Sequence, residues 1–175
     1  MSDNDNNELK GLGGWLILVG IGVVVSPVRL LVTSVQIYKP IFEDGTWEAL
    51  TTAGTPYYHS FWGPMIIGEI VFNALMVIAS LVLIYLFFKK HFLFPKVYIA
   101  LALLTLVFIP LDSWLVTFIM PNEPVFDPDT TKEFTRSLVS SMIWVPYMLV
   151  SKRVKATFVE NTSTDRSGLG TEVSA

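Results

Sequence analysis

Three ionisable side chains lie inside long apolar runs of the sequence: Arg29, Glu69 and Asp112. A guanidinium at the depth of a lipid bilayer costs about 2.5–3.5 kcal/mol on insertion scales unless it finds partners. Arg136 stands at the start of a further apolar run, and Asn73 follows Glu69 by one helical turn. Two chemistries fit this set: an ion-pair network that fixes helix packing, or a proton-responsive or solute-binding site in which Glu69 or Asp112 titrates.

Depth and helical phase predict that these side chains meet. Counted at about 1.5 Å per residue from the outer ends of their runs, Arg29, Glu69 and Asp112 lie roughly 10–14 Å below one membrane surface. At 100° per residue each run also has one polar stripe. The stripes contain Gly22, Ser26, Arg29, Thr33 and Gln36; Glu69, Asn73 and Ser80; Thr105 and Asp112; and Arg136, Ser140, Tyr147 and Ser151. We expect the stripes to face a shared interior in which two arginines and two carboxylates neutralise one another.

The elements that must position these residues are membrane-spanning helices. Only 15% of the 175 residues are charged and 52% are hydrophobic, whereas soluble domains carry roughly 25% charged residues. A spanning helix needs about 20 mostly apolar residues. We therefore predict an all-α integral membrane four-helix bundle over residues 11–159 with short periplasmic loops, and disordered tails over 1–10 and 160–175. The predicted spans are about 15–38, 64–88, 97–120 and 134–156.

The fourth span is the shortest of the predicted crossings. Its uninterrupted apolar stretch covers only residues 138–150, so a helix lying in the interface is the alternative there. The distribution of Lys and Arg near the span ends favours both termini in the cytoplasm, since cytoplasmic loops carry the excess of positive charge. The inner side then holds Lys10, Lys89, Lys90, Lys96, Lys152, Arg153 and Lys155, and the outer side Lys39, Lys132 and Arg136.

Aromatic and basic residues mark the predicted interfaces. Trp15, Tyr57, Tyr58 and Trp62 have the composition of membrane-interface anchors, and a ligand-binding lip is the alternative for the last three. The basic run of Lys152, Arg153 and Lys155 is explained by topology alone; binding of a lipid headgroup or docking of a protein is the alternative.

Several kinds of chemistry lack their residues in this sequence. There is no cysteine, so disulfides and thiolate metal sites are excluded. His59 and His91 fall at opposite membrane faces in the predicted topology, which disfavours a shared metal site. No phosphate-binding loop, zinc-ligand spacing, Ser-His-Asp set or dinucleotide fingerprint is present. We therefore expect no enzymatic activity, no cofactor, no metal and no nucleic-acid partner.

Three segments of the chain resemble a known family. They are GLGGWLILVGIGVVVSP (residues 11–27), FPKVYI (94–99) and WVPYMLVSKRVKATFV (144–159). Together they are similar to the bacterial family of small inner-membrane proteins known as domain of unknown function 2569. The resemblance covers roughly Gly11 to Val159 and implies a four-helix integral protein of the bacterial inner membrane. It implies no activity and transfers no catalytic residue.

Two functions follow from these patterns. The first is a non-enzymatic accessory or interaction subunit, held together by the network of Arg29, Glu69, Asp112 and Arg136. The second is a small proton-coupled transporter, or a pH or solute sensor, that uses Glu69 and Asp112. The expected partners are the lipid bilayer and either another membrane protein or a second copy of the chain.

Overall fold

The computed structural model describes residues 11–159, and all regular secondary structure in that range is helical. The helices are α2 (Trp15–Glu43), α3 (Thr46–Thr51), α4 (Trp62–Phe88), α5 (Phe94–Val116), α6 (Pro128–Val150) and α7 (Lys152–Thr157). The all-α prediction is confirmed for this range. The tails predicted over 1–10 and 160–175 lie outside the described residues.

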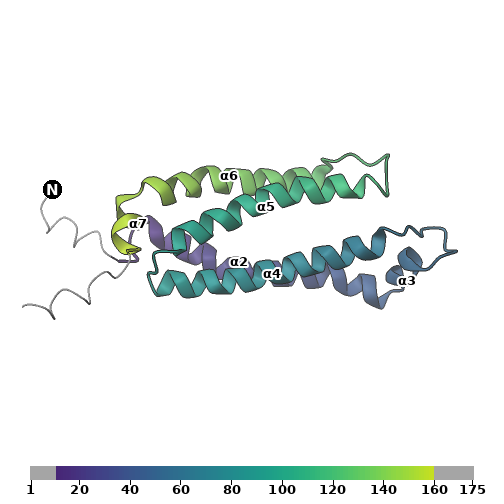
Figure 1. Cartoon of the computed structure of the whole chain (residues 1–175), viewed down its shortest axis with the longest axis horizontal. Helices are drawn as coiled ribbons and strands as arrows, with labels where there is room; N and C mark the ends of the chain where they lie inside the picture. The colour runs from purple at the N-terminus through teal and green to yellow at the C-terminus, as the bar shows by residue number, and fades with distance from the viewer. Residues whose placement is uncertain (1–10, 160–175) are drawn as a thin grey trace, which may run out of the picture.

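The four long helices form two antiparallel pairs (Figure 1). The most extensive contacts join α2 to α4 and α5 to α6, while α4 and α5 make a smaller contact between the pairs. A tight turn connects α4 to α5, with Lys90 in a left-handed backbone conformation (φ 52°). The pairs converge at one end, where α7 lies, and this end is called the α7 end below. The opposite end, called the loop end, carries α3 and residues 117–127.

The dry core of the molecule is at the α7 end. Leu16, Phe94 and Val154 are almost completely buried there, on α2, α5 and α7 respectively. The ring of Phe94 stacks on Phe158 (centroids 4.6 Å apart) and also packs against Phe87 of α4 (5.1 Å). Burial of these large apolar groups fixes α7 across the ends of the long helices, because it removes most of their surface from water.

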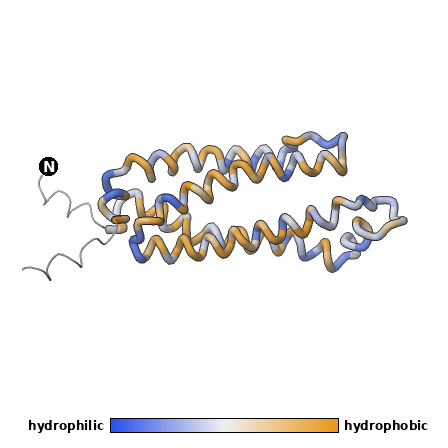
Figure 2. Tube along the Cα trace, in the orientation of Figure 1, coloured by the Kyte–Doolittle hydropathy of each residue, from blue (hydrophilic) through white to orange (hydrophobic). Residues whose placement is uncertain are grey.

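Three helices, α2, α4 and α5, are long and apolar enough to cross a membrane. Their outward faces carry exposed aliphatic side chains, among them Val24, Leu75 and Val107, and Figure 2 shows the mostly hydrophobic colouring along them. These helices correspond to the first three predicted spans. Helix α6 does not meet the same criterion within the described residues, because its first turns are polar (PDTTKEFTR).

The ends of the helices differ from the ends of the predicted spans at two places. Helix α2 continues past Tyr38 to Glu43, despite Pro40 in its last turns. The helix predicted over about 134–156 begins earlier, at Pro128, and breaks at Ser151. Asp and Pro favour the N-cap and first-turn positions, and here Asp127 caps α6. The Ser151 backbone is extended (ψ 121°) and its hydroxyl accepts a hydrogen bond from the Val154 N–H (3.4 Å), which starts α7 as a separate helix.

Candidate functional site

A cavity of about 930 Å³ lies between the two helix pairs, which is within the size range of small-molecule sites. Side chains from all four long helices and from residues 117–127 line it. The five residues predicted from the sequence are all in the lining: Arg29, Glu69, Asn73, Asp112 and Arg136. All five residues therefore line one cavity, but the arginines do not form ion pairs with Glu69 or Asp112 as the sequence predicted.

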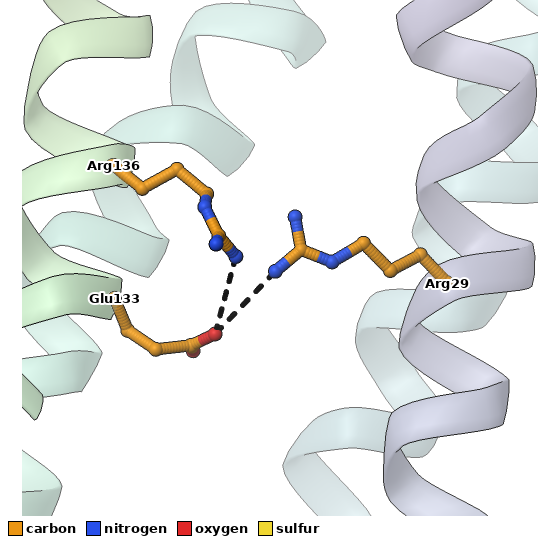
Figure 3. A network of polar contacts seen from close by, with 3 residues as sticks. All are labelled: Arg29, Glu133 and Arg136. Atoms are coloured by element: carbon orange, nitrogen blue, oxygen red, sulfur yellow. Dashed lines mark ion pairs between the residues drawn. The ribbon is translucent and has the colours of Figure 1, made fainter. Parts of the chain in front are cut away.

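The arginines share a carboxylate that the sequence prediction did not include (Figure 3). Arg29 of α2 and Arg136 of α6 both approach Glu133 of α6, and both contacts involve its Oε1 atom, at 3.5 and 3.8 Å. The side chains of Arg29, Glu133 and Arg136 are 54%, 58% and 48% exposed. The group therefore bridges α2 and α6 at the edge of the cavity, and it is not buried.

Glu69 contacts α2 through Tyr38 and not through Arg29. The Tyr38 hydroxyl donates to Glu69 Oε2 (3.3 Å) and accepts from the Asn73 side-chain amide (2.8 Å). Tyr38 is nine residues from Arg29, which is two and a half helical turns, so the two side chains leave α2 on opposite sides. This phase explains why Arg29 reaches α6 while Tyr38 reaches α4.

Asp112 lines the cavity from α5, on the same wall as Glu69. Next to it, the rings of Phe72 and Phe108 stack between α4 and α5 (centroids 3.4 Å apart, planes at 4°). Neither Glu69 nor Asp112 forms an ion pair among residues 11–159. In the same range no charged side chain is buried. The predicted neutralisation of these two acids by the two arginines is therefore wrong.

The polar stripes predicted from helical phase reach the cavity only in part. Thr33 and Thr105 line it, but Ser26, Gln36 and Ser80 do not. The hydroxyls of Ser26 and Ser80 donate to carbonyls one turn back in their own helices, at 2.6 and 2.8 Å. Because a serine can satisfy its hydrogen bond in this way, its place on a stripe does not require a polar surrounding.

The segment between α5 and α6 lines the cavity at the loop end, and this part of the lining is called the mouth below. Ser113 donates from its hydroxyl to the Val125 carbonyl, which ties this segment to α5. The Thr130 N–H donates to the Asp127 carboxylate (2.6 Å), and this hydrogen bond holds the pKa of Asp127 below its usual range. Glu123 and Asp129 also line the mouth, so its formal charge is negative.

The residues predicted as interface anchors lie at both ends of the molecule. Trp15 opens α2 at the α7 end, where its ring packs edge-on against Trp144 of α6 (6.4 Å). Tyr57 and Tyr58 are exposed before α4, and Trp62 is the first residue of that helix. Whether they contact lipid headgroups stays a prediction.

The predicted basic cluster divides into exposed and packed members. Lys152 and Lys155 are exposed on α7. The Arg153 guanidinium instead lies against the chain entering α2: a Cβ atom at Gly13 would be 2.9 Å from Arg153 Nη1. Within residues 11–159, no group of three or more His, Asp or Glu side chains is placed to hold a metal ion.

Sequence reasoning missed Glu133 and Tyr38 as members of the site. Glu133 precedes Arg136 by three residues, a spacing at which opposite charges on a helix are neighbours. This signal was available in the sequence. Tyr38 looked like the end of the first span because a lysine and a proline follow it. Its role depends on the continuation of α2 to Glu43, which no local pattern indicated.

The helical fold and the three helices long and apolar enough to cross a membrane indicate the class: an integral membrane protein. The family follows from a comparison with family models. Residues 9–159 match the model described as "Protein of unknown function (DUF2569)", and the chain belongs to this family. The resemblance of residues 11–159 is thus confirmed. Comparisons with curated proteins and with solved structures give no match.

Proposed function

We propose that this chain is a multi-pass protein of the bacterial inner membrane, without enzymatic activity, that binds a polar solute in the cavity between its two helix pairs. The observation that carries the proposal is a cavity of about 930 Å³ lined by charged groups from four helices. Ionisable residues inside membrane segments are costly, and they usually mark substrate pathways or binding sites. The proposal corresponds to the solute sensor or transporter predicted as the second function.

The accessory-subunit hypothesis has less support. It depended on a sealed charge network, whereas the side chains of Arg29 and Glu133 are more than half exposed. Glu69 and Asp112 have no arginine partner within ion-pair distance among the described residues. A set of charges that leaves its acids unpaired and accessible fits a site that exchanges solutes better than one that only fixes helix packing.

Contacts between the chain ends support four crossings. The Gly11 N–H donates to the Thr157 hydroxyl, which lies equally close to the Gly11 carbonyl (both 3.2 Å). Residues 11 and 157 therefore lie on the same side of the membrane. Three crossings by α2, α4 and α5 would leave the chain on the opposite side, so this contact supports a return crossing by α6. The second half of α6 carries exposed apolar side chains, including Val139, Met142 and Ile143, which suit contact with lipid.

The proposal predicts that water and small ions reach the cavity from outside. The chain has no cysteine, so single cysteines can be introduced without a prior change. Thr33→Cys and Thr105→Cys place a thiol in the cavity lining. Val35→Cys and Val107→Cys, two residues further along the same helices, place one on exposed apolar faces. A charged, membrane-impermeant thiol reagent added to spheroplasts should modify the first pair at least tenfold faster than the second.

The controls make the result decisive. All four variants should react with a membrane-permeant maleimide after denaturation, which shows that each thiol is present. Equal protection of Thr33→Cys and Val35→Cys from the charged reagent would mean that the cavity is closed to water, and the proposal of a solute site would fail.

A further inference from the structure

We propose that the solute is a zwitterion, with an ammonium group at one end and a carboxylate or phosphate at the other. Its oxyanion end binds between Arg29 and Arg136, in the place that Glu133 occupies, and its ammonium end binds beside Glu69 and Asp112. This inference rests on the function proposed above and adds the chemical class of the ligand.

The arginine side of the cavity is short of negative charge. Two guanidiniums contact a single oxygen atom, Glu133 Oε1, at 3.5 and 3.8 Å. Charge-assisted hydrogen bonds between a guanidinium and a carboxylate are normally about 2.7–2.9 Å long and often bidentate. The contacts with Glu133 are longer and use one oxygen only, so an incoming oxyanion can offer each arginine a better partner. Glu133 therefore acts as an internal competitor for this place.

The opposite wall is short of positive charge. Glu69 and Asp112 face the cavity from α4 and α5, and no Lys or Arg among the described residues forms an ion pair with either. The aromatic rings of Tyr38, Phe72 and Phe108 line the same side. Aromatic rings add to the attraction of an ammonium group when it lies over their faces.

A ligand that carries both charges can pair with the arginines on one side of the cavity and with Glu69 and Asp112 on the other. A simple anion would have to pass the acidic mouth and would leave Glu69 and Asp112 unpaired. A simple cation would pair with the acids but would leave Arg29 and Arg136 sharing the single carboxylate of Glu133. The two sides are also well separated, because Arg29 and Tyr38 are nine residues apart on α2, about 13 Å along its axis. The ligand should therefore carry its two charges at the ends of an extended chain.

Titration of the purified full chain in detergent tests the ligand class. The probes are glycine and 6-aminohexanoate, with hexanoate and hexylammonium as singly charged analogues. By isothermal titration calorimetry, 6-aminohexanoate should bind at least tenfold more tightly than either singly charged analogue and more tightly than glycine. Hexanoate or hexylammonium binding as tightly as 6-aminohexanoate would overturn the proposal, and so would the absence of any saturable binding.

Variants separate this role from a purely structural one. Arg29→Gln and Asp112→Asn should each weaken binding of 6-aminohexanoate at least tenfold, whereas Glu133→Gln should strengthen it because the competitor is lost. Loss of folding cannot imitate a gain in affinity. Lys39→Gln is the matched control, since within residues 11–159 Lys39 pairs with Glu43 alone, on the exposed surface of α2 (3.7 Å). Unchanged or weaker binding by Glu133→Gln would show that Glu133 does not occupy the oxyanion place.

Zwitterions that join an ammonium to an oxyanion occur as soluble metabolites and, with a shorter spacing between the two charges, as the headgroup of phosphatidylethanolamine. Repeating the titration in nanodiscs distinguishes these sources. Weaker binding in phosphatidylethanolamine than in phosphatidylglycerol nanodiscs assigns the cavity to the lipid headgroup, and equal binding assigns it to a soluble zwitterion. If the cysteines in the cavity react with the charged reagent but no zwitterion binds, the solute site stands and only the ligand class falls.

Discussion

At the scale of single residues, the hydroxyl of Tyr38 joins α2 to α4 on the acidic side of the cavity. It accepts a hydrogen bond from Asn73 and donates one to Glu69. Both partners come from α4 and are spaced one turn apart, so a single group on α2 fixes the register of the pair at this level. On the other side of the cavity Glu133 has the corresponding position between two arginines.

Removing the Tyr38 hydroxyl should weaken the α2–α4 pair. A net hydrogen bond contributes about 1 kcal/mol, and hydrogen bonds to charged groups somewhat more. Because water in the cavity can replace part of the loss, we expect Tyr38→Phe to lower the free energy of unfolding by about 1 kcal/mol. Thermal unfolding of the variant in detergent measures this change. Tyr85→Phe is the control, because Tyr85 is exposed (61%); an equal loss there would contradict the role assigned to Tyr38.

At the scale of elements, the packing of the Phe87 ring of α4 against α2 depends on a glycine. A Cβ atom built on Gly20 would lie 2.8 and 2.9 Å from the Cε1 and Cζ atoms of Phe87. Phe87 cannot easily move, since it is buried and packs against Phe94 and Phe158. The absence of a side chain at Gly20 thus lets the aromatic core form at the α7 end.

Two identical substitutions two residues apart should have opposite effects. Gly20→Ala overpacks the contact with Phe87, which typically costs about 1–3 kcal/mol, more than the gain in helix propensity. Gly22→Ala meets nothing within 4 Å, so it should gain stability, up to about 1 kcal/mol, from helix propensity alone. Thermal unfolding of both variants under one detergent condition compares them. A Gly20→Ala protein as stable as Gly22→Ala would show that α2 and α4 can separate at this point without cost.

The sequence predicted elements better than contacts, for physical reasons that particular residues make clear. Apolar runs of about 20 residues determine where helices such as α4 and α5 form, because that information is local. The partner of Arg29 is not local information. It depends on how α2 and α6 pack, and on α6 starting at Pro128 so that Glu133 lies on this helix within reach of Arg29. That these charged residues line one cavity was predictable from the polar residues on each apolar run. Which acid pairs with which arginine was not.

At the scale of the whole molecule, the two ends of the structure differ in kind. The α7 end is packed with aromatic and aliphatic side chains and ties the first described residues to the last through Gly11 and Thr157. Towards the loop end, the helix pairs border an open cavity lined by both charged and apolar side chains, including residues of the α5–α6 segment. If the cavity binds a solute as proposed, we expect the solute to enter from the side of the membrane that the loop end faces.

The difference between the two ends predicts which residues face the cytoplasm and which face the periplasm. Cytoplasmic segments carry the excess of Lys and Arg, and the α7 end holds Lys89, Lys90, Lys152 and Lys155 among its exposed residues. We therefore expect Lys155→Cys to react with an impermeant thiol reagent only after spheroplasts are permeabilised. Ala53→Cys and Glu123→Cys, exposed at the loop end, should react in intact spheroplasts.

The same three variants test whether α6 crosses. Glu123 precedes α6 and Lys155 follows it, so the two cysteines must label from opposite sides if α6 spans the membrane and from the same side if it lies in the interface. Reaction of both in intact spheroplasts would remove the fourth crossing. The hydrogen bonds between Gly11 and Thr157 (3.2 Å) would then be impossible in the membrane, because three crossings separate those residues by the thickness of the bilayer.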